Sequence, residues 1–241
     1  MITKISILIA ASLLSLTAAA NQYKTVKEKK STKNYEQDIS YPRFNKTSVP
    51  GYARLNTELK KQLLDGACDE KEAAMAEYPF NYSADVSVVG LNSRYVGLQI
   101  NYDDFCGGAH PNDGYYFETF SAQTGTLLPI GDEFGLYDYD NPKYNDAKDQ
   151  AIRLEIAKIL IKHLPKDSDT DCFGGNISEQ EKLDTLVSFY PSIGGLAKNK
   201  TVVLAISPPH VAEVCQFDAR VPYDEVKDLI LPGSYLIDWL K

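Results

Sequence analysis

The sequence lacks the residues and short motifs that most catalytic and metal sites require. It has only three histidines, His110, His163 and His210, so a polyhistidine metal site would need all three together. Its four cysteines include no CxxC pair, which argues against zinc and thioredoxin-like chemistry. The GxSxG, HExxH and SxxK patterns are all missing. We therefore predict a protein that is not an enzyme and that carries no metal and no cofactor.

The chain has only one long apolar run, and this run lies at the N-terminus. Lys4 precedes the apolar stretch 5–16, and the small residues 18–20 form a cleavage site. We predict a signal peptide over residues 1–20, cleaved after Ala20. The mature protein is then periplasmic or secreted and has no membrane span, because no later segment is apolar for long enough.

Clustered positive charge is also scarce. The formal net charge is −8 at pH 7, and the only lysine-rich segment covers residues 24–33. Nucleic acid and anionic membrane surfaces are therefore poor candidates for partners. The acidic balance suits a cationic partner, although the same charge also serves solubility alone.

The rest of the chain predicts an α+β fold. Residues 21–34 are polar and lysine-rich, which predicts a flexible leader. Alternating apolar residues indicate strands at 35–44, 82–88, 96–103 and 115–121, and strands are also expected at 186–190, 201–206 and 214–221. Helical spacing indicates helices at 55–75 and 145–164, and Pro222 opens a short helix at 223–230. We expect antiparallel sheet with two main helices packed on one side. The region 35–241 forms either one unit or two subdomains, of residues 35–105 and 106–241.

One loop concentrates conformationally special residues, with the sequence Cys106-Gly107-Gly108-Ala109-His110-Pro111-Asn112. The two glycines can adopt positive φ, and Pro111 fixes its own φ and restrains His110 to extended geometry. This composition predicts a loop that holds a fixed shape.

The four cysteines of an exported chain predict two disulfides, for which three connectivities are possible. We favour Cys68–Cys106 and Cys172–Cys215, because each pair lies within one half of the chain. Each bond would close a loop of about 40 residues and stabilise the fold by about 3–4 kcal/mol in the chain-entropy model.

The role of His110 has several interpretations. Catalysis would need an orienting carboxylate and a nucleophile within reach, and only Asp103, Asp104 and Asp113 are close in sequence. We therefore favour a hydrogen bond that braces its own loop over a general base or a metal ligand. Residues 167–171 imitate the start of a calcium loop, but Cys172 and Ser178 replace its glycine and glutamate.

The order of the segments resembles that of a known family. Tyr41-Pro42 is followed by a helix, two strands, the Gly107–Asn112 run and an aromatic strand, and Val221-Pro222-Tyr223 forms a late strand-to-helix junction. Residues 35–231 thereby resemble the paired extracytoplasmic domains of lysozyme-sensing anti-sigma factors and of the N-terminal region of some peptidoglycan deacetylases. The resemblance implies an α+β fold and binding at the cell wall rather than catalysis. The chain departs from the family at Pro208-Pro209-His210, where members tend to carry an aromatic residue.

These observations together predict a soluble binding protein that acts on a cell-wall hydrolase such as lysozyme, with inhibition as a further expected consequence. Tyrosines flank the glycine loop, and tyrosine is favoured at binding surfaces. Two alternatives stay open: a peptidoglycan- or glycan-binding module, and a cell-wall hydrolase with an unrecognised carboxylate pair. The predicted contact residues are Gly107, Gly108, His110, Pro111, Asn112 and, as an aromatic anchor, Tyr115.

Overall fold

The computed structural model of the chain describes residues 22–108, 110–137, 146–164, 173, 177–206 and 215–240. The predicted signal peptide, the calcium-like run 167–171 and His210 lie outside these residues. No helix in the described part of the chain is long and apolar enough to cross a membrane.

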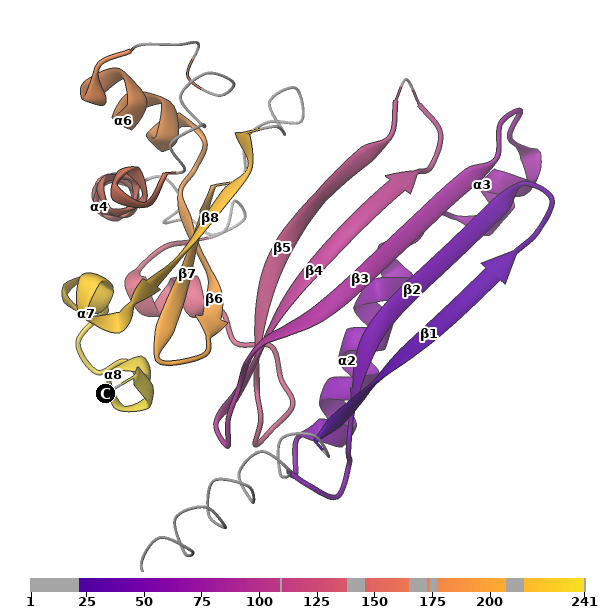
Figure 1. Cartoon of the computed structure of the whole chain (residues 1–241), viewed down its shortest axis with the longest axis horizontal. Coiled ribbons are helices and arrows are strands. Elements are labelled where there is room, and N and C mark those ends of the chain that lie inside the picture. The colour runs from indigo at the N-terminus through magenta and orange to yellow at the C-terminus, as the bar shows by residue number, and fades with distance from the viewer. Residues whose placement is uncertain are drawn as a thin grey trace, which may run out of the picture.

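The first unit is a five-stranded sheet covered on one face by helices (Figure 1). Its strands lie in chain order, and all neighbours are antiparallel except β2 and β3, which are parallel. The α+β class is confirmed, but this sheet is mixed rather than purely antiparallel. The reason is the helical connection between β2 and β3, because a parallel pair needs such a crossover. The elements are β1 (Tyr23–Ser31), β2 (Tyr35–Phe44), α2 (Tyr52–Asp65), α3 (Glu70–Met75), β3 (Phe80–Leu91), β4 (Tyr95–Phe105) and β5 (Asn112–Ser121).

The flexible leader predicted for residues 21–34 is wrong over most of its length. Tyr23–Ser31 forms β1, which pairs with β2 along its whole length at the edge of the sheet. The high lysine content of this segment is the reason for the predicted leader. Exposed lysines are, however, also typical of edge strands, where they discourage pairing with other chains. Val26 is partly buried and packs against the core of the first unit, so its side of β1 faces that core.

The buried stripe of α2 holds the helix on the sheet. Leu55, Leu59 and Leu63 recur at helical spacing and are almost fully buried, as the sequence predicts. The predicted helix 55–75 is divided, however, because α2 ends before Gly66 and α3 begins after Asp69. The Asp69 carboxylate accepts hydrogen bonds from the first backbone N–H groups of α3 and so caps a separate helix.

The second unit packs helices on a three-stranded antiparallel sheet with strand order β6-β7-β8. The long helix predicted at 145–164 is confirmed as α4. The strand predicted at 186–190 is wrong, because these residues end helix α6, whose start is fixed by a reciprocal Ser178–Glu181 capping box. The elements are η1 (Ile130–Phe134), α4 (Ala147–His163), α6 (Glu179–Ser188), β6 (Ser192–Ala197), β7 (Thr201–Ile206), β8 (Phe217–Pro222), α7 (Tyr223–Val226), η3 (Lys227–Leu229) and α8 (Leu236–Leu240).

A buried ion pair anchors α4 to its surroundings. Arg153 donates from Nε to Asp149 at 2.8 Å, and both side chains are buried. The same guanidinium donates to the carbonyl oxygens of Pro191 and Tyr137. These bonds matter because a buried charge costs several kcal/mol unless its hydrogen-bonding groups are satisfied.

The two units meet at a backbone contact that only glycine allows. A Cβ atom on Gly97 would lie 1.9 Å from the carbonyl oxygen of Leu196, and one on Gly90 would lie 2.8 Å from the same oxygen. The Leu196 N–H donates to Thr119 Oγ1 on β5 at 3.0 Å. Strand β6 therefore crosses directly over β3, β4 and β5. Since β5 pairs with β4, the first sheet extends to Ser121, beyond the predicted subdomain boundary at residues 105/106.

We expect the substitution Gly97→Ala to lower the free energy of unfolding by more than about 2 kcal/mol, because its methyl group must push β6 away from β4. Gly131→Ala is the matched control, since its Cβ would lie 3.6 Å from the nearest atom and should cost less than about 1 kcal/mol. Chemical denaturation measures both values. Equal losses in the two variants would contradict the close contact.

Candidate functional site

The predicted loop joins β4 to β5 as a hairpin end. Gly107 and Gly108 have the positive φ values that the sequence allows for, of +86° and +114°. Residues with a side chain rarely adopt this region. Cys106 is bonded to Cys68, with the two Cα atoms 5.1 Å apart, so the hairpin is tied to the segment that follows α2. The predicted Cys68–Cys106 disulfide is confirmed.

The second predicted bond, Cys172–Cys215, is not part of the described structure. Cys215 carries a buried free thiol, and Cys172 lies outside the described residues. Burial keeps the Cys215 thiol away from solvent, so it behaves there as a small apolar side chain.

The polar residues of the hairpin end hold one another. His110 is exposed, and its Nδ1 lies 3.2 Å from the Pro111 carbonyl oxygen, which accepts a hydrogen bond when Nδ1 carries the proton. Asn112 donates to Asp104 Oδ2 across the two strands at 3.2 Å. The histidine thus lies at the surface with its ring beside its own loop, and both the loop-bracing and the contact roles stay predictions.

Tyr115 lies apart from the hairpin end. Its ring is half-buried and makes an edge contact with Phe117, with ring centroids 5.8 Å apart. Burial, together with the charge and hydrogen bond of Asp218 on β8, raises the pKa of the Tyr115 hydroxyl. Its backbone N–H and C=O are both bonded to the side-chain amide of Gln216. Tyr115 therefore joins the two sheets, and the structure does not bring it together with His110.

A cavity that the sequence does not reveal lies farther along β5. It has a volume of about 280 Å³ and is bounded by β5, the segment around η1, and β6. Both polar and apolar side chains line the cavity, among them Tyr116, Glu118, Leu128, Asp132, Arg153 and Ile193.

Glu118 is the chemically distinctive residue of this cavity. Burial raises its pKa to about 7, although a hydrogen bond from Gln62 on α2 lowers it in part. Gln62 Nε2 donates to Glu118 Oε1 at 3.1 Å. Glu118 Oε2 and Gln62 Oε1 are buried and have no hydrogen-bond partner among the described residues. A proton on Oε2 turns one of these two acceptors into a donor, so the arrangement favours the neutral acid and allows proton exchange near neutral pH.

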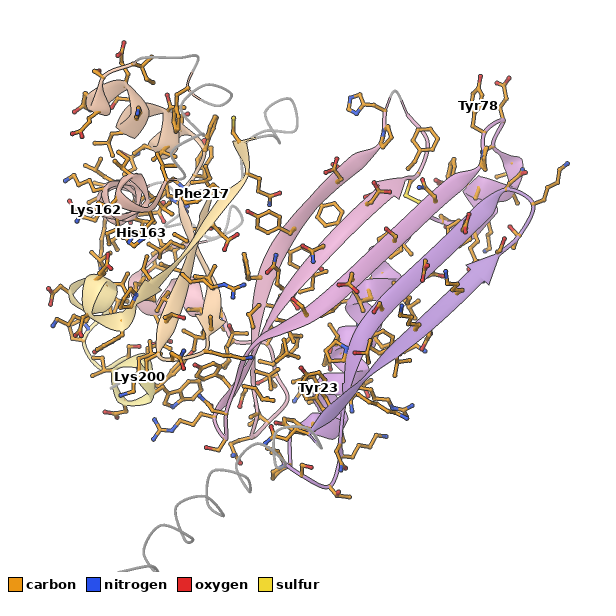
Figure 2. The ribbon with its side chains drawn as sticks, in the orientation of Figure 1. Tyr23, Tyr78, Lys162, His163, Lys200 and Phe217 are labelled. Carbon is orange, nitrogen blue, oxygen red and sulfur yellow. A yellow bond between two sulfur atoms is a disulfide. The ribbon has the colours of Figure 1, made fainter. Side chains whose placement is uncertain are left out.

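No group of three His, Cys, Asp or Glu side chains within the described ranges could hold a metal ion. His163 is instead paired with Glu225 at 3.1 Å, between α4 and α7, and Figure 2 shows it at the end of α4, beside Lys162. The three histidines are thus not brought into one described cluster.

Removal of the Cys68–Cys106 bond by a double change to serine should lower the free energy of unfolding by about 3–4 kcal/mol, because it frees a loop in the unfolded chain. The control Cys215→Ala removes a buried thiol that forms no disulfide with a described residue, and it should cost about 1 kcal/mol. Denaturation under non-reducing conditions measures both values. An unchanged free energy of unfolding in the double variant would contradict a stabilising role of the Cys68–Cys106 bond. Peptide mapping under the same non-reducing conditions tests the separate prediction of a Cys172–Cys215 bond.

The raised pKa of Glu118 predicts a pH-dependent stability. The folded protein holds this proton up to pH of about 7, whereas the unfolded chain releases it near its ordinary pKa of 4.5. The contribution to stability is therefore full at low pH and falls by about 3 kcal/mol as the pH rises from about 4.5 to 7.

Glu118→Gln should remove this dependence, so the variant gains stability relative to the wild type as the pH rises. Denaturation curves between pH 4.5 and 8 measure the difference. Glu28→Gln is the control, because hydrogen bonds from Lys60 and Tyr41 lower the pKa of Glu28. Its contribution to stability is lost only as the pH falls below about 4.5, so its difference from the wild type should stay nearly constant over the measured range. If the free energies of unfolding of the wild type and of Glu118→Gln differed by the same amount at all pH values, the raised pKa of Glu118 would be contradicted.

Comparison with known proteins supports part of the sequence resemblance. Residues 28–113 match the family described as "Deacetylase PdaC", a stretch that runs from β1 to the start of β5 and covers less than half of the chain. This part of the chain therefore resembles a deacetylase-associated domain, as the sequence predicts. The resemblance to anti-sigma factors stays a prediction. A search of curated proteins found no match.

Two solved structures share broad similarity with the chain. One is a DUF3298 family protein from Pseudomonas aeruginosa PAO1, with 15% identity, a TM-score of 0.41, and coverage of 87% of this chain and 95% of the other. The second is a member of the DUF3298 family from Bacteroides fragilis NCTC 9343, with 12% identity, a TM-score of 0.45, and coverage of 91% and 96%.

Proposed function

We propose that the protein is an exported, non-enzymatic binding protein of the cell envelope that binds a cell-wall hydrolase of the lysozyme type and inhibits it. The observation that carries the proposal is the β4–β5 hairpin end, which is exposed and yet fixed by a disulfide. Such an end loses little conformational freedom on binding, and so favours affinity. The partial match to the "Deacetylase PdaC" family supports work at the cell wall.

The charge of the hairpin end supports a cationic partner. Asp103 and Asp113 lie directly opposite each other in the β4–β5 pairing, and both are exposed. Like charges in this position destabilise a sheet. A basic partner such as a c-type lysozyme would relieve the repulsion and associate faster with a negative surface.

Titration of a c-type lysozyme into the protein by calorimetry tests the proposal. We expect saturable binding, weakened about tenfold in the double variant Asp103→Asn/Asp113→Asn, with the larger loss at low ionic strength. Asp184→Asn/Asp228→Asn changes the charge equally on exposed sites of the second unit and should bind as the wild type does. No detectable binding with lysozyme at about 50 µM would exclude lysozyme as the partner, because an interaction with a dissociation constant in the low micromolar range would be near saturation there.

Two further measurements separate the roles within this proposal. His110→Ala distinguishes a contact from a brace, because lost affinity at unchanged thermal stability identifies a contact residue. Sedimentation with insoluble peptidoglycan, in the absence of any hydrolase, should leave the protein in solution. Cosedimentation would instead favour the glycan-binding alternative.

A further inference from the structure

A second groove lies on the first unit, between α2 and the strands β1 and β2. It has a volume of about 480 Å³. Positive side chains dominate its lining on a protein whose formal net charge is −8. The charged residues that line it are Glu28, Arg43, Lys46, Lys60, Lys61 and Asp65.

One of these cations is already neutralised. Lys60 Nζ lies 2.8 Å from both carboxylate oxygens of Glu28, which also accepts a hydrogen bond from the Tyr41 hydroxyl. The Lys60 hydrogen bond, followed by that of Tyr41, holds the pKa of Glu28 below its usual value. Glu28 therefore stays charged, and its strongest partner is Lys60, with a smaller contribution from the charge of Arg43.

Three cations remain without an ion pair in the described structure. Arg43, Lys46 and Lys61 are exposed, and the acids in the same groove are Asp65 and the Lys60-paired Glu28. Lys24 lies opposite Arg43 in the β1–β2 pairing and adds a further positive charge beside it. The remaining excess of two charges in the groove suits an anion of similar charge.

The walls of the groove are fixed relative to each other. The Asn56 side chain on α2 accepts from the Phe44 backbone N–H at 2.8 Å and donates to the Phe44 carbonyl oxygen at 2.9 Å. These two bonds lock the helix to the end of β2, next to Arg43. The cations are thus held around a preformed space, which lowers the cost of ordering them on binding.

We propose that this groove, lined by Arg43, Lys46 and Lys61, is an anion-binding site for a small ligand that carries phosphate groups. Phosphate fits better than a single carboxylate, because a guanidinium can bind two of its oxygens while two lysines neutralise its further charge. The acidic remainder of the protein repels anions and so confines them to this groove. The site is independent of the hairpin end and of the lysozyme proposal.

Pyrophosphate, a small analogue of such a ligand, allows a direct test by calorimetry. We expect saturable binding with a dissociation constant between about 10 µM and 1 mM, weakening as salt is added. Arg43→Gln/Lys61→Gln should weaken binding by about tenfold or more. The control Lys198→Gln/Lys200→Gln removes the same charge from the β6–β7 turn of the second unit, where Figure 2 labels Lys200, and should bind as the wild type does.

Three results would overturn the site. The first is no saturable heat up to about 10 mM pyrophosphate. The second is an equal loss of pyrophosphate affinity in the control variant Lys198→Gln/Lys200→Gln, which would mean that pyrophosphate is attracted to surface charge in general. The third is binding to vesicles that contain phosphatidylglycerol without binding to pyrophosphate, which would mean a membrane surface. Thermal unfolding of each free variant checks that the fold is intact, and bound pyrophosphate should raise the unfolding temperature of the wild type and of the control.

Discussion

The arrangement of the molecule depends on the contact of the Leu196 carbonyl with Gly97 and Gly90. Because no side chain fits between them, the two sheets approach to backbone distance, where further bonds form. The Tyr95 hydroxyl donates to the Ala197 carbonyl at 2.8 Å, and the Lys198 N–H donates to the Val89 carbonyl at 2.9 Å. This crossing places β6 over β5 and so bounds the Glu118 cavity.

The first sheet carries opposite charges at its two ends. The hairpin end presents Asp103 and Asp113. Arg43 lines the groove and is the second-last residue of β2, whose C-terminal end lies at the end of the sheet away from the hairpin (Figure 1). A net charge of −8 conceals this division, since the cations that gather in the groove come from separate parts of the sequence. Electrostatic complementarity can therefore favour a cationic partner at one end and an anionic ligand at the other.

The sequence predicts the elements whose signals are local. Strict alternation locates β2 to β5, and the leucine spacing locates α2, because each pattern reports the face that is buried. It misses β1, whose lysines resemble those of a solvated leader. It also misses α6, because the apolar residues at its end and the two aromatic residues just after it resemble a strand. The two candidate sites are missed for a different reason. The pKa of Glu118 is raised by burial in the folded chain, where Gln62, 56 residues away, is its hydrogen-bond donor. The groove joins residues 28, 43, 46 and 61 only after folding.

Helix α2 is connected to all three features. Its residues Lys60 and Lys61 line the groove, whereas the next residue, Gln62, donates a hydrogen bond to Glu118. Just past its end, Cys68 holds the hairpin through the bond to Cys106. Because Leu55, Leu59 and Leu63 seat this helix in the core, it cannot shift without cost to packing. The position of one buried stripe therefore bears on the brace of the hairpin, on the hydrogen bond to Glu118 and on one wall of the cationic groove.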